Sequence, residues 1–191
     1  MSVVTSPTRS ASVSVDLQTR AAEGENEKII EGYFALFNTP TELFTGYFEE
    51  IAPGAFDETI SGDIRALIDH DTAKVLGRTK SKTLDLKVDS RGLWGSIKIN
   101  EKDLEALNLY ERVKRGDVDQ CSFGFQIDEE KYTFGDDGTV KSRLEKVGLF
   151  EVSVVTFPAY DDTGVQARRH NAEQAKSKML EVRKKRLKER L

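Results

Sequence analysis

The segment Gln120–Asp128 reads QCSFGFQID and alternates between apolar and small or polar residues. Such alternation over a short run is typical of a β-strand with one face in the core. The apolar positions are Cys121, Phe123, Phe125 and Ile127. In this pattern Ser122 and Gly124 share the opposite face, and a glycine inside a strand often marks a close approach by another group. The segment predicts a strand that presents a serine beside open space, although a serine on a solvated sheet face has the same pattern.

Cys121 competes with Ser122 as a nucleophile, because an ionised thiol is the more reactive group. Its position in the strand places it among aromatic residues, where a thiol stays protonated and behaves as a small apolar side chain. The alternation therefore favours Ser122 and assigns Cys121 to the core. As the only cysteine, Cys121 cannot form an internal disulfide, which agrees with a reducing cytoplasm.

Glu151 is the one charged residue of VGLFEVSVVTF, residues 147–157. This run is apolar on both faces and predicts a central strand that is covered on both sides. A carboxylate in such a strand costs free energy unless it is paired or hydrogen-bonded. A histidine would fit as its partner, since a carboxylate can orient an imidazole and stabilise its protonated form. The alternative is a glutamate near the strand end that reaches solvent.

The chain has two histidines as candidates for that partner. His70 ends the alternating run IRALIDHD, residues 64–71, between Asp69 and Asp71, which make its surroundings negative. A lone solvent-facing or core histidine has the same pattern. His170 follows the last predicted strand, next to a basic segment, and is interpreted as a linker residue.

Other segments predict a fold rich in strands. Strands are expected over residues 28–37, 47–51, 83–88 and 93–99, the last two forming a hairpin. One helix is expected after Asn100, which suits an N-terminal cap, and before Gly116, which suits a C-terminal cap. Many strands with few helices indicate a mostly β fold with surrounding helices, an α+β arrangement built on an antiparallel barrel or sandwich.

Charge divides the 191 residues into an acidic body and a basic end. Ten Lys or Arg and three Glu from Arg168 onward give +7, whereas the preceding residues carry −11. We expect a flexible N-terminal arm (1–27), one domain (28–169) and a basic helical tail (170–191). No apolar run approaches the roughly 20 residues that cross a bilayer, and the N-terminus lacks the pattern of a secretory signal. Two histidines and one cysteine are fewer than the four Cys or His ligands usual in a structural zinc site. A metal bound by carboxylates is the alternative, but no cluster of such ligands stands out, so neither a metal nor a cofactor is expected.

Several segments, in order, resemble the prohead serine protease family of tailed phages, which is related to the herpesvirus capsid-maturation protease. They are EGYFALFN (31–38), EIAPGAF (50–56), LIDHD (67–71), LGRT (76–79), CSFGF (121–125), LFEVSVV (149–155) and FPAY (157–160). Each segment is short, but their shared order is specific. The similarity covers nearly the whole predicted domain.

The resemblance implies a serine endopeptidase in which Ser122 is the nucleophile, His70 the general base and Glu151 the third catalytic residue. Herpesvirus relatives use a second histidine in the third role, but His170 falls after the final matching segment. The family's fold is a closed antiparallel β-barrel of the herpesvirus-protease type, surrounded by helices, which is therefore expected here. Arg78 in LGRT could line the site, although a surface salt bridge is the alternative.

The resemblance further implies cleavage of scaffold protein, of the major capsid protein and of the protease itself during prohead maturation. The expected place is the assembling procapsid in the host cytoplasm, and the expected partners are those substrates and further copies of the chain, with no membrane partner. Because few residues follow the matching segments, we expect the scaffold to be a separate protein or a segment of the capsid protein.

Two alternatives belong to other functional classes. A non-catalytic assembly protein could use the same fold to bind scaffold or capsid subunits, and self-shortening of the purified chain would distinguish it from a protease. The basic tail could instead neutralise the phosphates of packaged nucleic acid. The charge of −11 on the body and the lack of aromatic residues in the tail argue against nucleic acid as a partner.

Overall fold

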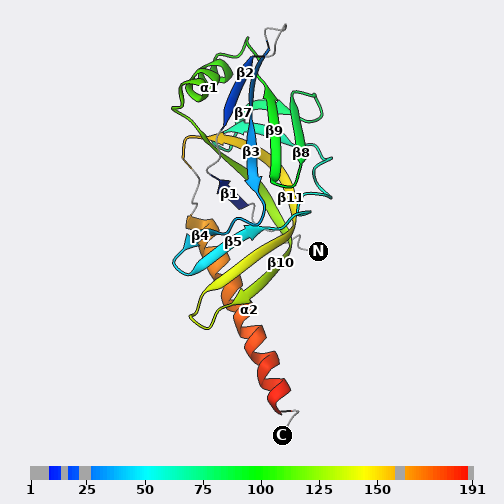
Figure 1. Cartoon of the computed structure of the whole chain (residues 1–191), viewed down its shortest axis with the longest axis vertical. Helices are drawn as coiled ribbons and strands as arrows, with labels where there is room; N and C mark the ends of the chain where they lie inside the picture. Colours follow the sequence, from blue (N-terminus) through cyan, green and yellow to red (C-terminus); the bar gives the residue numbers. More distant parts are fainter. Residues whose placement is uncertain (1–8, 14–16, 22–26, 158–161, 189–191) are drawn as a thin grey trace.

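The computed structural model describes residues 9–13, 17–21, 27–157 and 162–188, which form a mostly β fold with two helices (Figure 1). The elements are β1 (Arg9–Val13), β2 (Gln18–Ala21), β3 (Lys28–Leu36), β4 (Thr41–Phe44), β5 (Tyr47–Ile51), β6 (Arg65–Ile68), β7 (Asp71–Arg78), β8 (Leu84–Val88), β9 (Gly92–Lys98), α1 (Leu104–Arg115), β10 (Gln120–Phe134), β11 (Val140–Val155) and α2 (Asp162–Lys188). Within these ranges no helix has the length and apolar character needed to cross a membrane.

β10 and β11 form the centre of the larger sheet, whose order is β1-β10-β11-β5-β4 with β6 and β7 attached through β11. They pair antiparallel from Gln120↔Val155 to Phe134↔Val140, on either side of a polar turn. The second edge of β11 is shared by two parallel partners: β5 pairs with its beginning and β6 with Glu151–Val154. This arrangement brings β6 beside the part of β11 that pairs with the strand of Ser122.

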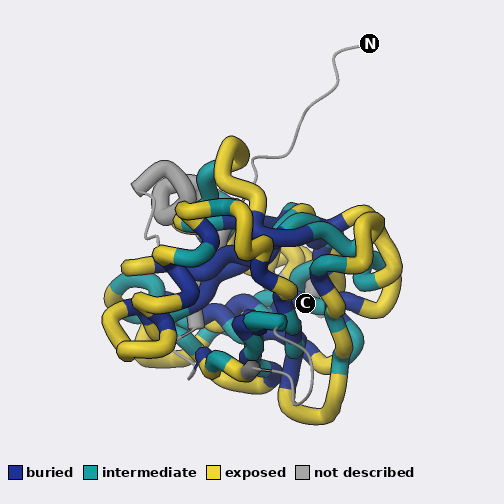
Figure 2. Tube along the Cα trace, turned by 90° about the horizontal axis from the view of Figure 1, so that it is seen from above, coloured by how far each residue is buried: buried dark blue, intermediate teal, exposed yellow. Residues whose placement is uncertain are grey.

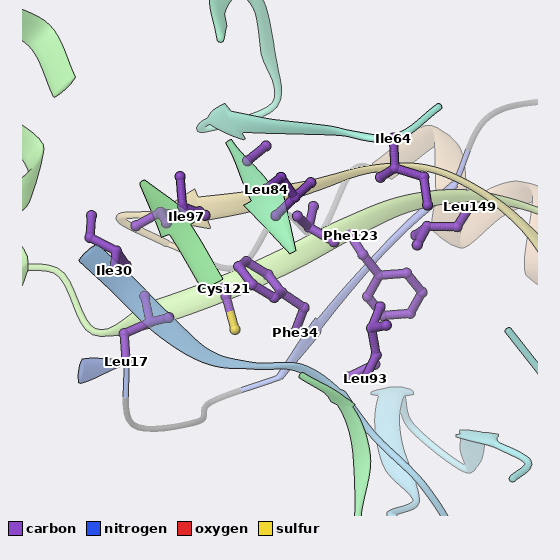
Figure 3. Packing of buried hydrophobic residues seen from close by; sticks show 14 of the residues in the cluster. Leu17, Ile30, Phe34, Ile64, Leu84, Leu93, Ile97, Cys121, Phe123 and Leu149 are labelled. Atoms are coloured by element: carbon purple, nitrogen blue, oxygen red, sulfur yellow. The ribbon is translucent and has the colours of Figure 1, made fainter. Parts of the chain in front are cut away.

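The smaller sheet has the order β2-β3-β9-β8 and contains the hairpin that the sequence predicts for residues 83–99. The core joins this sheet to the larger one: Phe34 and Ile97 belong to the same buried cluster as Cys121 and Phe123 (Figure 3). Buried residues lie along the middle of the trace, and exposed ones lie in the outer loops (Figure 2). Each large buried side chain contributes about 1.5–3 kcal/mol through its apolar area, so the core side of β10 anchors this strand firmly.

The expected closed barrel is not found, because the described strands form two separate sheets. β10 has only two edges, and β11 occupies one of them. β1 pairs antiparallel along the other edge, from Arg9↔Phe125 to Val13↔Cys121. β1 is therefore an edge strand of the larger sheet, and no described strand pairs it with the smaller sheet, so the hydrogen-bonding path does not close.

Two short strands, β1 and β2, lie within the segment expected to be a flexible arm, residues 1–27. These strands offer little apolar surface, which is why the sequence suggests no structure there. They are ordered instead by backbone pairing with distant strands, β1 with β10 and β2 with β3. The other arm residues, 1–8, 14–16 and 22–26, lie outside the described part of the chain.

The C-terminal helix α2 begins at Asp162, earlier than the expected tail at residue 170, and runs away from the sheets at one end of the molecule (Figure 1). Its first part stays close to the body: the Arg169 guanidinium carbon lies 4.6 Å from the centre of the Phe44 ring. The predicted tail is thus a continuation of one helix, as far as Lys188. Residues 189–191 lie outside the described residues.

Helix α1 confirms the predicted helix and corrects its N-terminal cap. Asp103, not Asn100, has the extended backbone of a cap, and its carboxylate accepts hydrogen bonds from the amides of Glu105 and Ala106. The side-chain oxygen of Asn100 accepts from the amide of Lys102, in the preceding turn. Gly116 ends the helix at φ 81°, a left-handed conformation that glycine adopts at little cost.

We expect Asp103→Ala to lower the free energy of unfolding by about 1 kcal/mol, because two amides of the first turn lose their acceptor. Chemical denaturation of the full chain measures this loss. Asn100→Ala is the matched control and should have a smaller effect. An equal or larger loss for Asn100→Ala would return the cap to the position that the sequence alone suggests.

Candidate active site

A β-bulge in β11 decides which side chains face Ser122. Phe125 pairs with Leu149 and Gly124 pairs with Glu151, so Phe150 is left without an opposite residue and is exposed. An extra residue of this kind reverses the facing of the residues that follow it. As a result Glu151 lies on the face of Ser122, whereas Leu149 before the bulge and Val152 after it lie in the core.

Gly124 is the close approach that the sequence suggests. A Cβ atom added there would lie 2.3 Å from Oε1 of Glu151. The carboxylate of Glu151 therefore fills the space above Gly124 that a side chain on β10 would otherwise occupy.

His70 does not end a strand, as its alternating segment suggests, but lies in the two-residue turn between β6 and β7. Ile68 pairs with Asp71 across this turn. The two turn residues, Asp69 and His70, have φ angles of 48° and 58°. Positive φ at both central residues is the pattern of a type I′ turn, the tight hairpin turn that suits the twist of paired strands. Each non-glycine residue in this region costs on the order of 1–2 kcal/mol, so contacts from elsewhere must hold the turn.

Strand β11 and the residue that follows it provide those contacts. The amide of Asp69 donates to the carbonyl of Val154 at 3.0 Å, and the amide of Thr156 donates to Oδ1 of Asp69 at 2.8 Å. The amide of His70 donates to Oγ of Ser153 at 3.3 Å. The left-handed turn is thus tied to the same strand that carries Glu151.

The structure brings Ser122, His70 and Glu151 together in one hydrogen-bonded chain. Nε2 of His70 lies 2.9 Å from Oγ of Ser122, and Nδ1 lies 2.7 Å from Oε1 of Glu151. A neutral imidazole satisfies both contacts in one tautomer, in which Nδ1–H donates to the carboxylate and Nε2 accepts from the hydroxyl. In this arrangement the ring can take the serine proton while the carboxylate holds its orientation.

Ser153 is a fourth member of the site that the sequence analysis missed. Its hydroxyl donates to Oε2 of Glu151 at 2.6 Å, and its Oγ accepts from the amide of His70. Ser153 is fully buried and pairs across the strands with Ser122. The signal was present in the sequence, since Glu151 and Ser153 are two residues apart in a strand and must share a face.

Burial is uneven among these residues. Ser122 has 0% of its surface exposed, whereas the side chains of His70 and Glu151 retain 23% and 14%. Solvent therefore reaches the imidazole and the carboxylate, but it does not reach the serine in this state of the molecule.

The other candidate residues lie elsewhere. Cys121 is buried on the core face, its Sγ donates to the carbonyl of Tyr33 at 2.8 Å, and burial raises the pKa of the thiol to about 12. His170 is exposed on α2, where its ring lies 2.8 Å from the amide nitrogen of Gln174. Arg78 forms a two-pronged ion pair with Asp63, the surface salt bridge considered as its alternative role. No group of three or more potential metal ligands occurs among the described side chains.

The arrangement of a serine, a histidine and a carboxylate on a strand-rich fold agrees with the family to which the sequence is matched. The model of the Caudovirus prohead serine protease family matches residues 15–178, and the chain belongs to this family.

Two known proteins are similar to this chain, one in sequence and one in structure. The prohead protease of Enterobacteria phage HK97 is 28% identical over 139 residues, which are 73% of this chain and 59% of that protein. The matched region thus spans less than two thirds of the HK97 protein. The solved structure of the bacteriophage T4 capsid assembly protease aligns with a TM-score of 0.46 and 11% identity, over 78% of this chain and 98% of that one.

We expect Cys121 to resist alkylation by iodoacetamide at pH 8 in the folded chain, because the thiolate forms only as the pH approaches about 12 and the sulfur is buried. Mass spectrometry of the intact protein should show no adduct until denaturant is added. Rapid labelling of the folded chain would mean that Cys121 is accessible and ionised, and would restore it as a candidate nucleophile.

Proposed function

We propose that the chain is a serine endopeptidase in which Ser122 is the nucleophile, His70 the general base and Glu151 the residue that orients the base. The observation that carries this proposal is the continuous contact from Oγ of Ser122 through both ring nitrogens of His70 to Glu151, at 2.9 Å and 2.7 Å. A catalytic triad is defined by this geometry and not by the order of its residues along the chain.

The proposed reaction is acyl transfer in two halves. Nε2 of His70 takes the hydroxyl proton as Oγ of Ser122 bonds to the carbonyl carbon of a peptide. The C–N bond of the tetrahedral intermediate then breaks, and His70 gives the proton to the leaving amine. In the second half His70 takes a proton from water as the water oxygen bonds to the acyl carbon. The bond between that carbon and Oγ of Ser122 then breaks, and His70 gives the proton to Oγ. Glu151 accepts from Nδ1–H throughout and stabilises the imidazolium that forms in each half.

The proposed substrates are the scaffold protein, the major capsid protein and further copies of the protease, inside an assembling procapsid in the host cytoplasm. Membership of the prohead protease family supports this setting. The HK97 relative, named a prohead protease, supports it as well.

We expect Ser122→Ala and His70→Ala to abolish cleavage to the same extent, because the two residues act as one unit and their losses do not add. The test is incubation of each variant with the cognate capsid and scaffold proteins, followed by mass spectrometry of the fragments. Cys121→Ala is the control for Ser122, since it lies next in sequence but on the core face, and it should keep most activity. A folded but inactive Cys121→Ala protein would contradict the assignment.

We expect a graded loss at the two supporting residues. Glu151→Gln should lower kcat by about 10³–10⁴-fold, because an amide in this position favours the wrong tautomer of the histidine. Ser153→Ala should lower kcat by about 10–100-fold with KM unchanged, since it removes a hydrogen bond to a charged group that does not touch the substrate.

Ser142→Ala is the matched control for Ser153: it is another buried serine of β11 and donates to a different carboxylate, Glu130. Its activity should be that of the wild type. If Glu151→Gln were fully active, the third residue would lie elsewhere, and His170→Ala would be the next variant to measure.

One observation favours the non-catalytic alternative. Ser122 has no exposed surface, as would suit an assembly protein that keeps the fold but not the chemistry. The cleavage assay separates the two functions: wild-type chain that leaves the capsid and scaffold proteins intact, and does not shorten itself, would favour the assembly protein.

A further inference from the structure

Strand β1 occupies the edge of β10 that faces away from β11. Its five residues pair antiparallel with Cys121–Phe125, and the register sets Ser12 opposite Ser122 and Ser10 opposite Gly124. Ser122 therefore lies within a five-residue stretch of β10 whose outward edge is filled by a segment from the N-terminal part of the chain.

We propose that this edge of β10 is the site at which the extended backbone of a peptide substrate binds, and that β1 is an internal competitor for it. The inference rests on the proposed function and adds to it the mode of substrate binding. An extended peptide can join an open sheet edge through main-chain hydrogen bonds, largely independent of its side chains. The opposite edge of β10 is held by β11, so the edge of β1 is the one that a peptide strand beside Ser122 can use.

The burial of Ser122 supports the competition. A carbonyl carbon must come within about 3–3.5 Å of Oγ for attack, yet Ser122 has 0% exposure while β1 is paired with its strand. The side chain of His70 is 23% exposed, so the site is open on the side of the base and closed at the nucleophile. A segment of the chain has to leave before a substrate can enter, and β1 is paired directly with the strand of the nucleophile.

The composition of β1 keeps the free energy needed to separate it from β10 small. The segment reads RSASV, in which serine and alanine have no strong preference for strands. Five residues provide few inter-strand hydrogen bonds, each worth about 1 kcal/mol net. A substrate strand would replace these bonds with equivalent ones, so the exchange is close to balanced and a peptide with better strand-forming residues would displace β1.

The test uses full-length chain with Ala11→Pro and Ser12→Pro together. Prolines at adjacent positions remove one amide from each side of the strand, so pairing with β10 is weakened whichever amides face it. We expect kcat/KM for an added peptide substrate to rise about tenfold, since more of the protein is in the state that binds it. Thr5→Pro is the control, as it adds a proline to the same segment outside β1. The milder pair Ala11→Gly and Ser12→Gly should give an intermediate rise.

A second measurement separates this inference from the proposed function. In the Ser122→Ala background, amide hydrogen exchange at residues 121–125 should become faster with the two prolines and slow again when a synthetic peptide of residues 6–16 is added. The same peptide with prolines at positions 11 and 12 should have no effect. These results would support the binding edge even if no cleavage were detected. Unchanged exchange, or equal kcat/KM for the double-proline and Thr5→Pro proteins, would overturn it.

Discussion

The register between β10 and β11 is the constraint on which the rest of the site depends. Because Phe150 is an extra residue in this pairing, the strand is in the core on both sides of the bulge, yet Glu151 and Ser153 face Ser122. The same strand then pairs with β6 and ties down the turn of His70. One pairing thus positions Ser122, His70 and Glu151, and loops contribute only the two-residue turn.

The conformation of the site costs free energy, and hydrogen bonds from neighbouring residues offset that cost. Two consecutive residues adopt positive φ, and a carboxylate is largely withdrawn from water, each at a cost in free energy. Glu151 offsets its cost by accepting from the imidazole and from Ser153, and the turn offsets its own by hydrogen bonds to β11. Backbone strain that surrounding contacts hold in place is common at functional sites. Here the strained turn places the imidazole of His70 within hydrogen-bonding distance of Ser122 on β10 and Glu151 on β11.

The local sequence pattern predicts those features of the site that depend on neighbouring residues alone. Period-two alternation separated Ser122 from Cys121, and the cost of a buried charge singled out Glu151 and its need for a partner. The turn of His70 was out of reach, since IRALIDHD alternates like a strand and is bent only by pairing with residues more than eighty positions later. β1 was missed because backbone pairing with a distant edge leaves no periodic signal. The closed barrel, an expectation carried over from relatives, is not found among the described strands, because the two sheets are not hydrogen-bonded to each other.

β11 is the last of the described strands in chain order, and this order determines when the site can form. His70 and Glu151 are 81 residues apart in the chain. At roughly 5–20 residues per second, the ribosome adds Glu151 about 4 to 16 s after His70. A growing polypeptide therefore carries the histidine and the serine without the carboxylate, and without the strand that bends the histidine's turn. The contact among Ser122, His70 and Glu151 can therefore form only after β11 has been synthesised and has paired with β10 and β6.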